Sequence, residues 1–126
     1  MANGAKKILV VEDELFLRDL YVQILKDAGY EIDSASDGDE GFKKLQVGGY
    51  DLVLLDIVLP KRDGIQILRD LQKAPPEKPN GAIIVMSNID KEATIAEGVA
   101  LGIKGHIVKS DYTPDQLLAE VARLLA

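Results

Sequence analysis

Five short apolar segments alternate with segments of helical periodicity along the whole chain, and this alternation constrains the fold more than any other feature. The segments typical of buried strands are ILVV (8–11), YEIDSA (30–35), DLVLLD (51–56), AIIVMS (82–87) and GHIVK (105–109). Because helices that join parallel strands cover both faces of a sheet, the pattern predicts an α/β fold with right-handed crossovers. We expect a flavodoxin-like, doubly wound sheet of five parallel strands in the order 2-1-3-4-5, with five helices.

The segments between the strands carry local signals for where helices begin and end. Gly29 follows the first helical pattern, at the position where glycine commonly ends a helix. Either Ser36 or Asp37 can cap the second helix through a side-chain oxygen. A fourth, poorer helix is expected over about residues 90–100, where β-branched residues and a glycine lower helix propensity. TPDQ (113–116) is a capping box with proline at the first helical position, so it predicts the start of the last helix.

Length and charge exclude several classes of protein. The chain has 126 residues, which suits one domain with one core, and we expect a single domain over residues 1–126 with no output domain. Acidic residues outnumber basic ones by 21 to 15, which disfavours nucleic-acid binding and docking on anionic lipid. The absence of cysteine excludes disulfides and thiolate metal sites. No apolar run approaches the length of a membrane span and no signal-peptide pattern opens the chain, so we expect a cytoplasmic protein.

Polar residues follow four of the apolar segments, at the sheet edge where ligands bind in such folds. Glu12 and Asp13 follow the first segment, and Asp56, Ser87 and Lys109 end the third, fourth and fifth. Because the first and third strands would be neighbours, we expect three carboxylates to converge. Their mutual repulsion is tolerable if a hard divalent cation takes up the charge, and Mg²⁺ suits carboxylate, water and phosphate oxygens.

These residue types together suit phosphoryl transfer. A carboxylate such as Asp56 can accept a phosphoryl group as an acyl phosphate. A cation and the ammonium group of Lys109 would stabilise charge on the moving group, and Ser87 would supply a hydroxyl. The strand ends therefore predict a site for phosphoryl transfer.

The motifs ILVVEDE, DLVLLDIVLPKRDG, IIVMSN and GHIVK occur in the order and spacing of response-regulator receiver domains. The chain resembles that family over essentially all of its 126 residues. The resemblance implies that Asp56 accepts a phosphoryl group from a sensor histidine kinase or a histidine phosphotransfer protein. It also implies that Glu12, Asp13, Asp56 and the backbone carbonyl of Val58 hold Mg²⁺, while Lys109 contacts the phosphoryl oxygens.

The resemblance further implies a conformational switch. In the family, the residue at the position of Ser87 is drawn toward the phosphoryl group, and an aromatic side chain three residues before the lysine rotates with it. This sequence departs from the pattern, because His106 occupies the aromatic position and Ser110 replaces the proline that usually follows a cis peptide bond. A non-proline cis bond costs about 3 kcal/mol, so we expect a trans bond between Lys109 and Ser110 and a reshaped loop.

The function that follows is a stand-alone, monomeric receiver that switches its binding to a downstream protein target. Such a chain is not an enzyme beyond catalysing its own Mg²⁺-dependent phosphorylation and dephosphorylation. The alternative is a degenerate receiver-fold interaction module that is not phosphorylated. Retention of the acceptor, the acidic pair and the lysine counts against it, whereas Ser110 leaves it open. A haloacid-dehalogenase-type phosphatase would need a D-x-D pair after the first strand, and the common nucleotide-binding glycine motifs do not occur.

Each residue also has a purely structural interpretation. Alone, Ser87 would be a strand end, Lys109 a lysine whose stem covers apolar surface, and His106 a half-buried packing residue rather than a catalytic base. Glu14 is interpreted as a favourable charge at a helix start. Residues expected to be caps, turn residues or solvated side chains are Asp37, Asp39, Asp63, Lys61, Arg62 and Tyr112.

Two apolar residues bear on the lifetime of the acyl phosphate. Val58 and Ile89 lie two residues beyond Asp56 and Ser87, where side chains can border the route of the attacking water. Neither can orient that water, so we expect slow hydrolysis.

Overall fold

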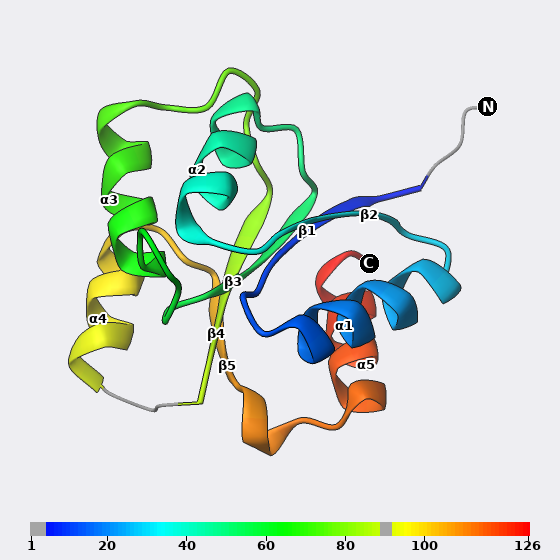
Figure 1. The fold of residues 1–126 in the computed structure, drawn as a ribbon. Coiled ribbons are helices and arrows are strands. Elements are labelled where there is room, and N and C mark those ends of the chain that lie inside the picture. The colour runs from blue at the N-terminus through cyan, green and yellow to red at the C-terminus, as the bar shows by residue number, and fades with distance from the viewer. Residues whose placement is uncertain (1–4, 89–91) are drawn as a thin grey trace.

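A computed structural model describes residues 5–88 and 92–126, and within them one parallel sheet organises the chain (Figure 1). The strand order is β2-β1-β3-β4-β5, as the alternation predicted. The strands are β1 (Lys7–Val11), β2 (Glu31–Ala35), β3 (Leu52–Asp56), β4 (Ala82–Ser87) and β5 (Gly105–Val108). All five residues of β3 are buried, whereas the edge strand β2 is mostly half-exposed, which explains its weaker apolar pattern.

Five helices cover the two faces of the sheet. They are α1 (Leu15–Asp27), α2 (Gly38–Val47), α3 (Gly64–Lys73), α4 (Glu92–Ala100) and α5 (Pro114–Leu124), with a 3₁₀ turn η1 (Lys109–Asp111) after β5. Figure 1 shows α1 and α5 on one face, and α2, α3 and α4 on the other. Two apolar cores result, because alternate residues of each strand point to opposite faces.

The helix starts are formed by the polar residues that the sequence placed there. Asp37 rather than Ser36 caps α2, and its Oδ1 accepts a hydrogen bond from the Glu40 amide at 2.8 Å. Asp63 caps α3 in the same way, and Thr113 forms the predicted capping box of α5. Gly29 has a φ of 99°, a left-handed conformation that glycine adopts without a steric penalty.

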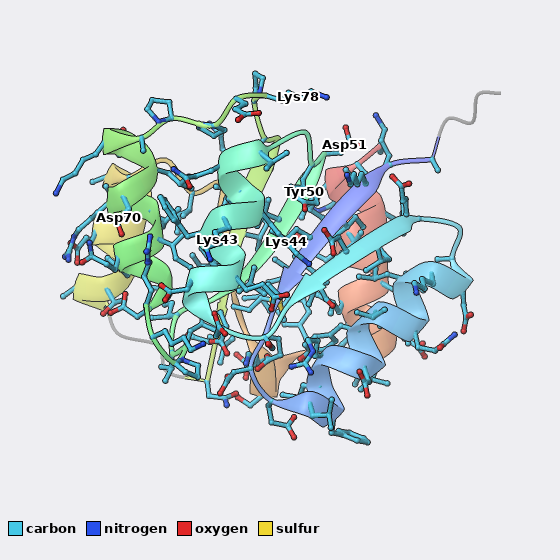
Figure 2. All side chains as sticks on the ribbon, turned by 45° about the horizontal axis from the view of Figure 1, so that its top comes forward. Lys43, Lys44, Tyr50, Asp51, Asp70 and Lys78 are labelled. Atoms are coloured by element: carbon cyan, nitrogen blue, oxygen red, sulfur yellow. The ribbon has the colours of Figure 1, made fainter. Side chains whose placement is uncertain are left out.

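A polar network holds α2 against β2 and the start of β3. The Tyr50 hydroxyl donates to Asp33 Oδ2 at 2.7 Å, and Lys44 Nζ lies 2.8 Å from Asp33 Oδ1. Figure 2 labels Tyr50 and Lys44 on this side of the molecule. Burial and the hydrogen bond to Asp33 raise the pKa of Tyr50, so its hydroxyl stays a donor. The network fixes one end of α2, away from the carboxyl ends of the strands.

Helix α4 has fewer buried residues than the other four helices. Gly98 is its one buried residue. A Cβ there would lie 2.8 Å from Cδ1 of Ile103, so the helix approaches the chain closely at this point. An exposed ion pair between Arg69 and Glu97 connects α3 to α4. The segment with the poorest helical pattern therefore also buries the fewest of its own residues against the sheet.

Candidate functional site

The side chains at the carboxyl edge are sorted between the two faces by the strand alternation. Asp56 is in register with Met86, and Met86 with Ile107, so these residues form one row on the face covered by α1 and α5. Glu12 lies two residues beyond Val10, which belongs to the core of the same face. Lys109 likewise lies two residues beyond Ile107. The register thus brings Glu12, Asp56 and Lys109 to one side of the sheet edge.

One ammonium group joins two of the carboxylates. Lys109 Nζ lies 2.8 Å from Asp56 Oδ2 and 2.5 Å from Glu12 Oε1. All three side chains are nearly buried, at 8% exposed for Lys109, 7% for Asp56 and 3% for Glu12. Asp13 is exposed, yet one of its carboxylate oxygens lies within 4.8 Å of oxygens from Glu12 and Asp56. The structure therefore brings together the four charged residues expected to converge, while their chemical roles remain predictions.

Burial and the neighbouring charges shift the pKa values of Glu12 and Lys109 in opposite directions. Burial raises the pKa of Glu12, against hydrogen bonds from Lys109 and from the Glu14 amide that favour the ionised form. Burial alone would lower the pKa of Lys109, but its hydrogen bonds to Asp56 and Glu12 outweigh this effect and raise it. The ammonium therefore stays charged at neutral pH, and ionisation of Glu12 is costly unless another cation is present.

The acidic cluster fits a hard divalent cation. Three carboxylates and one ammonium carry a formal charge of -3 + 1 = -2, which one divalent ion would neutralise. The donors are all oxygens, as Mg²⁺ prefers. The Val58 amide donates to Asp56 Oδ1 at 3.3 Å, so the chain turns back over the Asp56 side chain just beyond β3. The expected role of the Val58 carbonyl as a metal ligand stays a prediction.

The loop between β3 and α3 is fixed closely behind Asp56. The Gly64 amide donates to the Ile57 carbonyl at 2.8 Å, and a Cβ on Gly64 would lie 2.4 Å from the Asp56 carbonyl oxygen. Any other residue at position 64 would therefore push the loop away from Asp56. The Asp63–Gly64 pair thus both starts α3 and seats the loop that carries Val58.

The expectation that Arg62 is solvated was wrong. Its guanidinium pairs with Asp39 and Asp70, both at 3.1 Å, and lies 4.1 Å from the centre of the Phe42 ring. The side chain is only 25% exposed. Arg62 therefore ties the loop after β3 to α2 and α3. Lys61 is mainly exposed, as expected, although it lies 3.4 Å from Asp37.

Ser87 and His106 lie on the opposite face from Asp56. Ser87 is 2% exposed at the end of β4, and His106 is in register with Val85, which belongs to the core beneath α2 and α3. His106 is half-buried, and its Nε2 has no hydrogen-bond partner in the part of the chain that the structure describes. A switch role for either residue stays a prediction. Ile89 lies outside the described residues.

The departure at Ser110 has a local structural consequence. The Lys109–Ser110 bond is trans, as expected. Residues Lys109–Asp111 form the turn η1, in which the Tyr112 amide lies 3.3 Å from the Lys109 carbonyl. Lys109 therefore opens a turn rather than ending β5. A cavity of about 200 Å³ lies beside this turn, between α1 and α5. Tyr112, at its rim, is 37% exposed.

Sequence reasoning missed Arg18. Its Nη1 donates to the carbonyl oxygens of Glu12 at 3.0 Å and Asp13 at 3.4 Å. Nothing in one sequence separates this residue from a solvated arginine on a helix. Only the tight connection between β1 and α1 aims the side chain back at the acidic pair.

Comparison with known proteins gives consistent results. The family model for the response regulator receiver domain matches residues 8–122. The transcriptional regulatory protein DltR of Streptococcus agalactiae is 39% identical over 115 residues, which are 91% of this chain and 50% of DltR. The chemotaxis protein CheY of Treponema pallidum is 39% identical over 85% of this chain and 75% of that protein. The chain thus spans about half the length of the first of these relatives.

A solved structure with the same fold comes from Thermotoga maritima. The response regulator protein TrrA, in complex with Mg²⁺-BeF, superposes with a TM-score of 0.78 at 36% identity. The match covers 95% of this chain and 99% of TrrA. Among the described residues, no helix has the length and apolar character needed to cross a membrane.

Proposed function

Because this chain belongs to the response regulator receiver domain family, we propose that Asp56 is the phosphoryl acceptor of a signalling switch. Members of the family are phosphoacceptor switches rather than classical enzymes. The phosphodonor would be a phosphohistidine of a sensor histidine kinase or of a histidine phosphotransfer protein. The observation that carries the proposal is the position of Lys109 Nζ, 2.8 Å from Asp56 and 2.5 Å from Glu12, with Asp13 beside them.

The proposed transfer is a displacement at phosphorus. A carboxylate oxygen of Asp56 forms the new P–O bond while the P–N bond to the donor imidazole breaks. The electron pair of that bond stays on the imidazole nitrogen of the donor. Because phosphorylation replaces the carboxylate charge of Asp56 with the charge of the phosphoryl group, the ammonium of Lys109 becomes available to the phosphoryl oxygens. Glu12 keeps the ammonium at the site during this exchange.

Glu12, Asp13 and Asp56 are the residues that would hold Mg²⁺. A bound Mg²⁺ supplies charge stabilisation for the phosphoryl oxygens. The similar protein TrrA was solved in complex with Mg²⁺-BeF, which supports the proposal of a Mg²⁺ site in this chain. Val58 would add its backbone carbonyl from the loop that Gly64 and Arg62 hold in place.

The proposed output passes through the opposite face of the sheet. Ser87 ends β4 beside the acceptor strand, and His106 lies on β5 on the same face as Val85. A movement of Ser87 toward the phosphoryl group would therefore alter packing beneath α4, the helix with the thinnest core. We propose that a downstream protein target recognises this change.

Mass spectrometry after incubation with acetyl phosphate and Mg²⁺ tests the proposal. The wild-type chain should gain one phosphoryl group, and Asp56→Asn should gain none. Asp27→Asn is the matched control, because Asp27 is an exposed aspartate near the end of α1 and should leave labelling intact. Absence of labelling in the wild type, despite Mg²⁺ binding, would favour the alternative of an unphosphorylated interaction module.

A further inference from the structure

The side chain of Arg18 reaches back from α1 to the loop that carries two of the acidic residues. A single nitrogen, Nη1, donates to the carbonyl of Glu12 at 3.0 Å and to that of Asp13 at 3.4 Å. These two consecutive peptide groups are joined to the two carboxylates expected to bind a metal. The orientation of these two peptide groups therefore influences the directions in which the carboxylates of Glu12 and Asp13 point.

The rest of this short loop is also held by named contacts. The Glu12 amide donates to the Ala35 carbonyl at 3.0 Å, which anchors the start of the loop on β2. The Glu14 amide donates to Glu12 Oε2 at 3.1 Å, and Glu14 Oε2 accepts from the Leu17 amide at 2.8 Å. Asp13 is the exposed member of the acidic pair. The contact from Arg18 therefore restrains the part of the loop that is nearest to solvent.

The charge of Arg18 has the wrong sign to help a cation directly. A guanidinium near three carboxylates repels a divalent ion, and this repulsion is stronger in a partly buried site than in water. Any benefit to metal binding must therefore come from the geometry of the loop. Groups that orient metal ligands in this way commonly change metal affinity by about 10- to 100-fold when they are removed.

We propose that Arg18 is a positioning residue of the metal site, which holds the peptide groups of Glu12 and Asp13 so that their carboxylates converge with Asp56. The proposal rests on the function proposed above, because it assumes that these residues bind Mg²⁺. Arg18 itself touches neither the metal nor the phosphoryl group. Its effect is on the affinity of the site for Mg²⁺.

The sign of the change in Mg²⁺ affinity separates positioning from charge. The probe is Mg²⁺ alone, titrated at neutral pH and followed by backbone amide chemical shifts of the full chain. Positioning predicts that Arg18→Ala weakens Mg²⁺ binding by about tenfold. Simple removal of a positive charge predicts tighter binding. Arg18→Lys keeps the charge but not the planar donor group, so it should bind with an intermediate affinity.

Arg123→Ala is the matched control, because it changes the net charge equally and removes an arginine that is 68% exposed near the end of α5. Its Mg²⁺ affinity should equal that of the wild type. A second readout needs no metal: amide hydrogen exchange at residues 13–15 should be faster in Arg18→Ala, with the urea midpoint of the whole domain little changed.

The outcomes are distinguishable. Failure of the wild type to bind Mg²⁺ overturns the proposed function, and this inference with it. Normal binding by the wild type, with equal or tighter binding by Arg18→Ala, overturns only the positioning role. If Arg18→Ala fails to fold, Arg18→Lys decides: reduced affinity at an unchanged urea midpoint supports positioning, and unchanged affinity overturns it.

Discussion

Lys109 Nζ lies 2.8 Å from Asp56 Oδ2, although 53 positions separate the two residues in the chain. Both side chains are less than 10% exposed, and Lys109 also contacts Glu12. A buried carboxylate needs a partner because the loss of hydration is costly. This single contact therefore explains how an apolar strand can end in a buried aspartate.

Removal of the ammonium should destabilise the domain. In Lys109→Met, Glu12 and Asp56 would remain buried without a countercharge, and breaking such a pair typically costs about 3–5 kcal/mol. Urea unfolding at pH 7 measures the loss, which should shrink when millimolar Mg²⁺ supplies a replacement charge. Lys43→Met, on α2 in Figure 2, is the control, since Lys43 is exposed. Equal stability of the two variants would contradict the structure.

Glu12 should make the metal-free protein less stable as pH rises. Burial raises its pKa, so the folded state binds this proton more tightly than the unfolded state does. Its contribution to stability therefore falls as pH rises from the ordinary value of 4.5 through the raised pKa. The difference in unfolding free energy between Glu12→Gln and the wild type should grow in favour of the variant from pH 4 to pH 7. Saturating Mg²⁺ should reverse that difference. A difference in unfolding free energy that does not change with pH would contradict a raised pKa of Glu12.

The buried nitrogen of His106 should be dispensable for stability. Nε2 has no hydrogen-bond partner within the described parts of the chain, and such a group typically costs about 1–3 kcal/mol. His106→Phe should therefore match or exceed the wild type in urea unfolding, whereas His106→Ala should be less stable because it leaves a void. A clear loss of stability in the phenylalanine variant would show that the imidazole makes a necessary polar contact.

The lifetime of the acyl phosphate should depend on position 58. Val58 is 64% exposed just beyond Asp56, and its apolar side chain cannot orient an attacking water. Val58→Asn adds a hydrogen-bonding group there, so hydrolysis of the phosphorylated chain should be severalfold faster. Loss of the phosphoryl group, followed by intact mass, measures the rate, and Val47→Asn on the distant end of α2 is the control. An unchanged rate of acyl phosphate hydrolysis in Val58→Asn would contradict this expectation.

Much of the fold was predictable because it is encoded over short stretches of sequence. The continuous apolar run of β3, the cap at Asp37 and the capping box at Thr113 act within a few residues. The strand ends also showed which polar residues would share an edge. The predicted order of strands then made Glu12 and Asp56 neighbours before any distance was known.

What the tertiary structure alone decided concerns long side chains and loops. Arg18 and Arg62 have several rotatable bonds, and their direction depends on loops that are fixed by contacts distant in sequence. The environment of the buried His106 Nε2, which has no hydrogen-bond partner among residues 5–88 and 92–126, likewise depends on what packs above β5. Sequence periodicity determined which residues reach the edge of this sheet. Tertiary packing decided which charges meet there, because electrostatic interactions and hydrogen bonds depend on distances that local patterns do not specify.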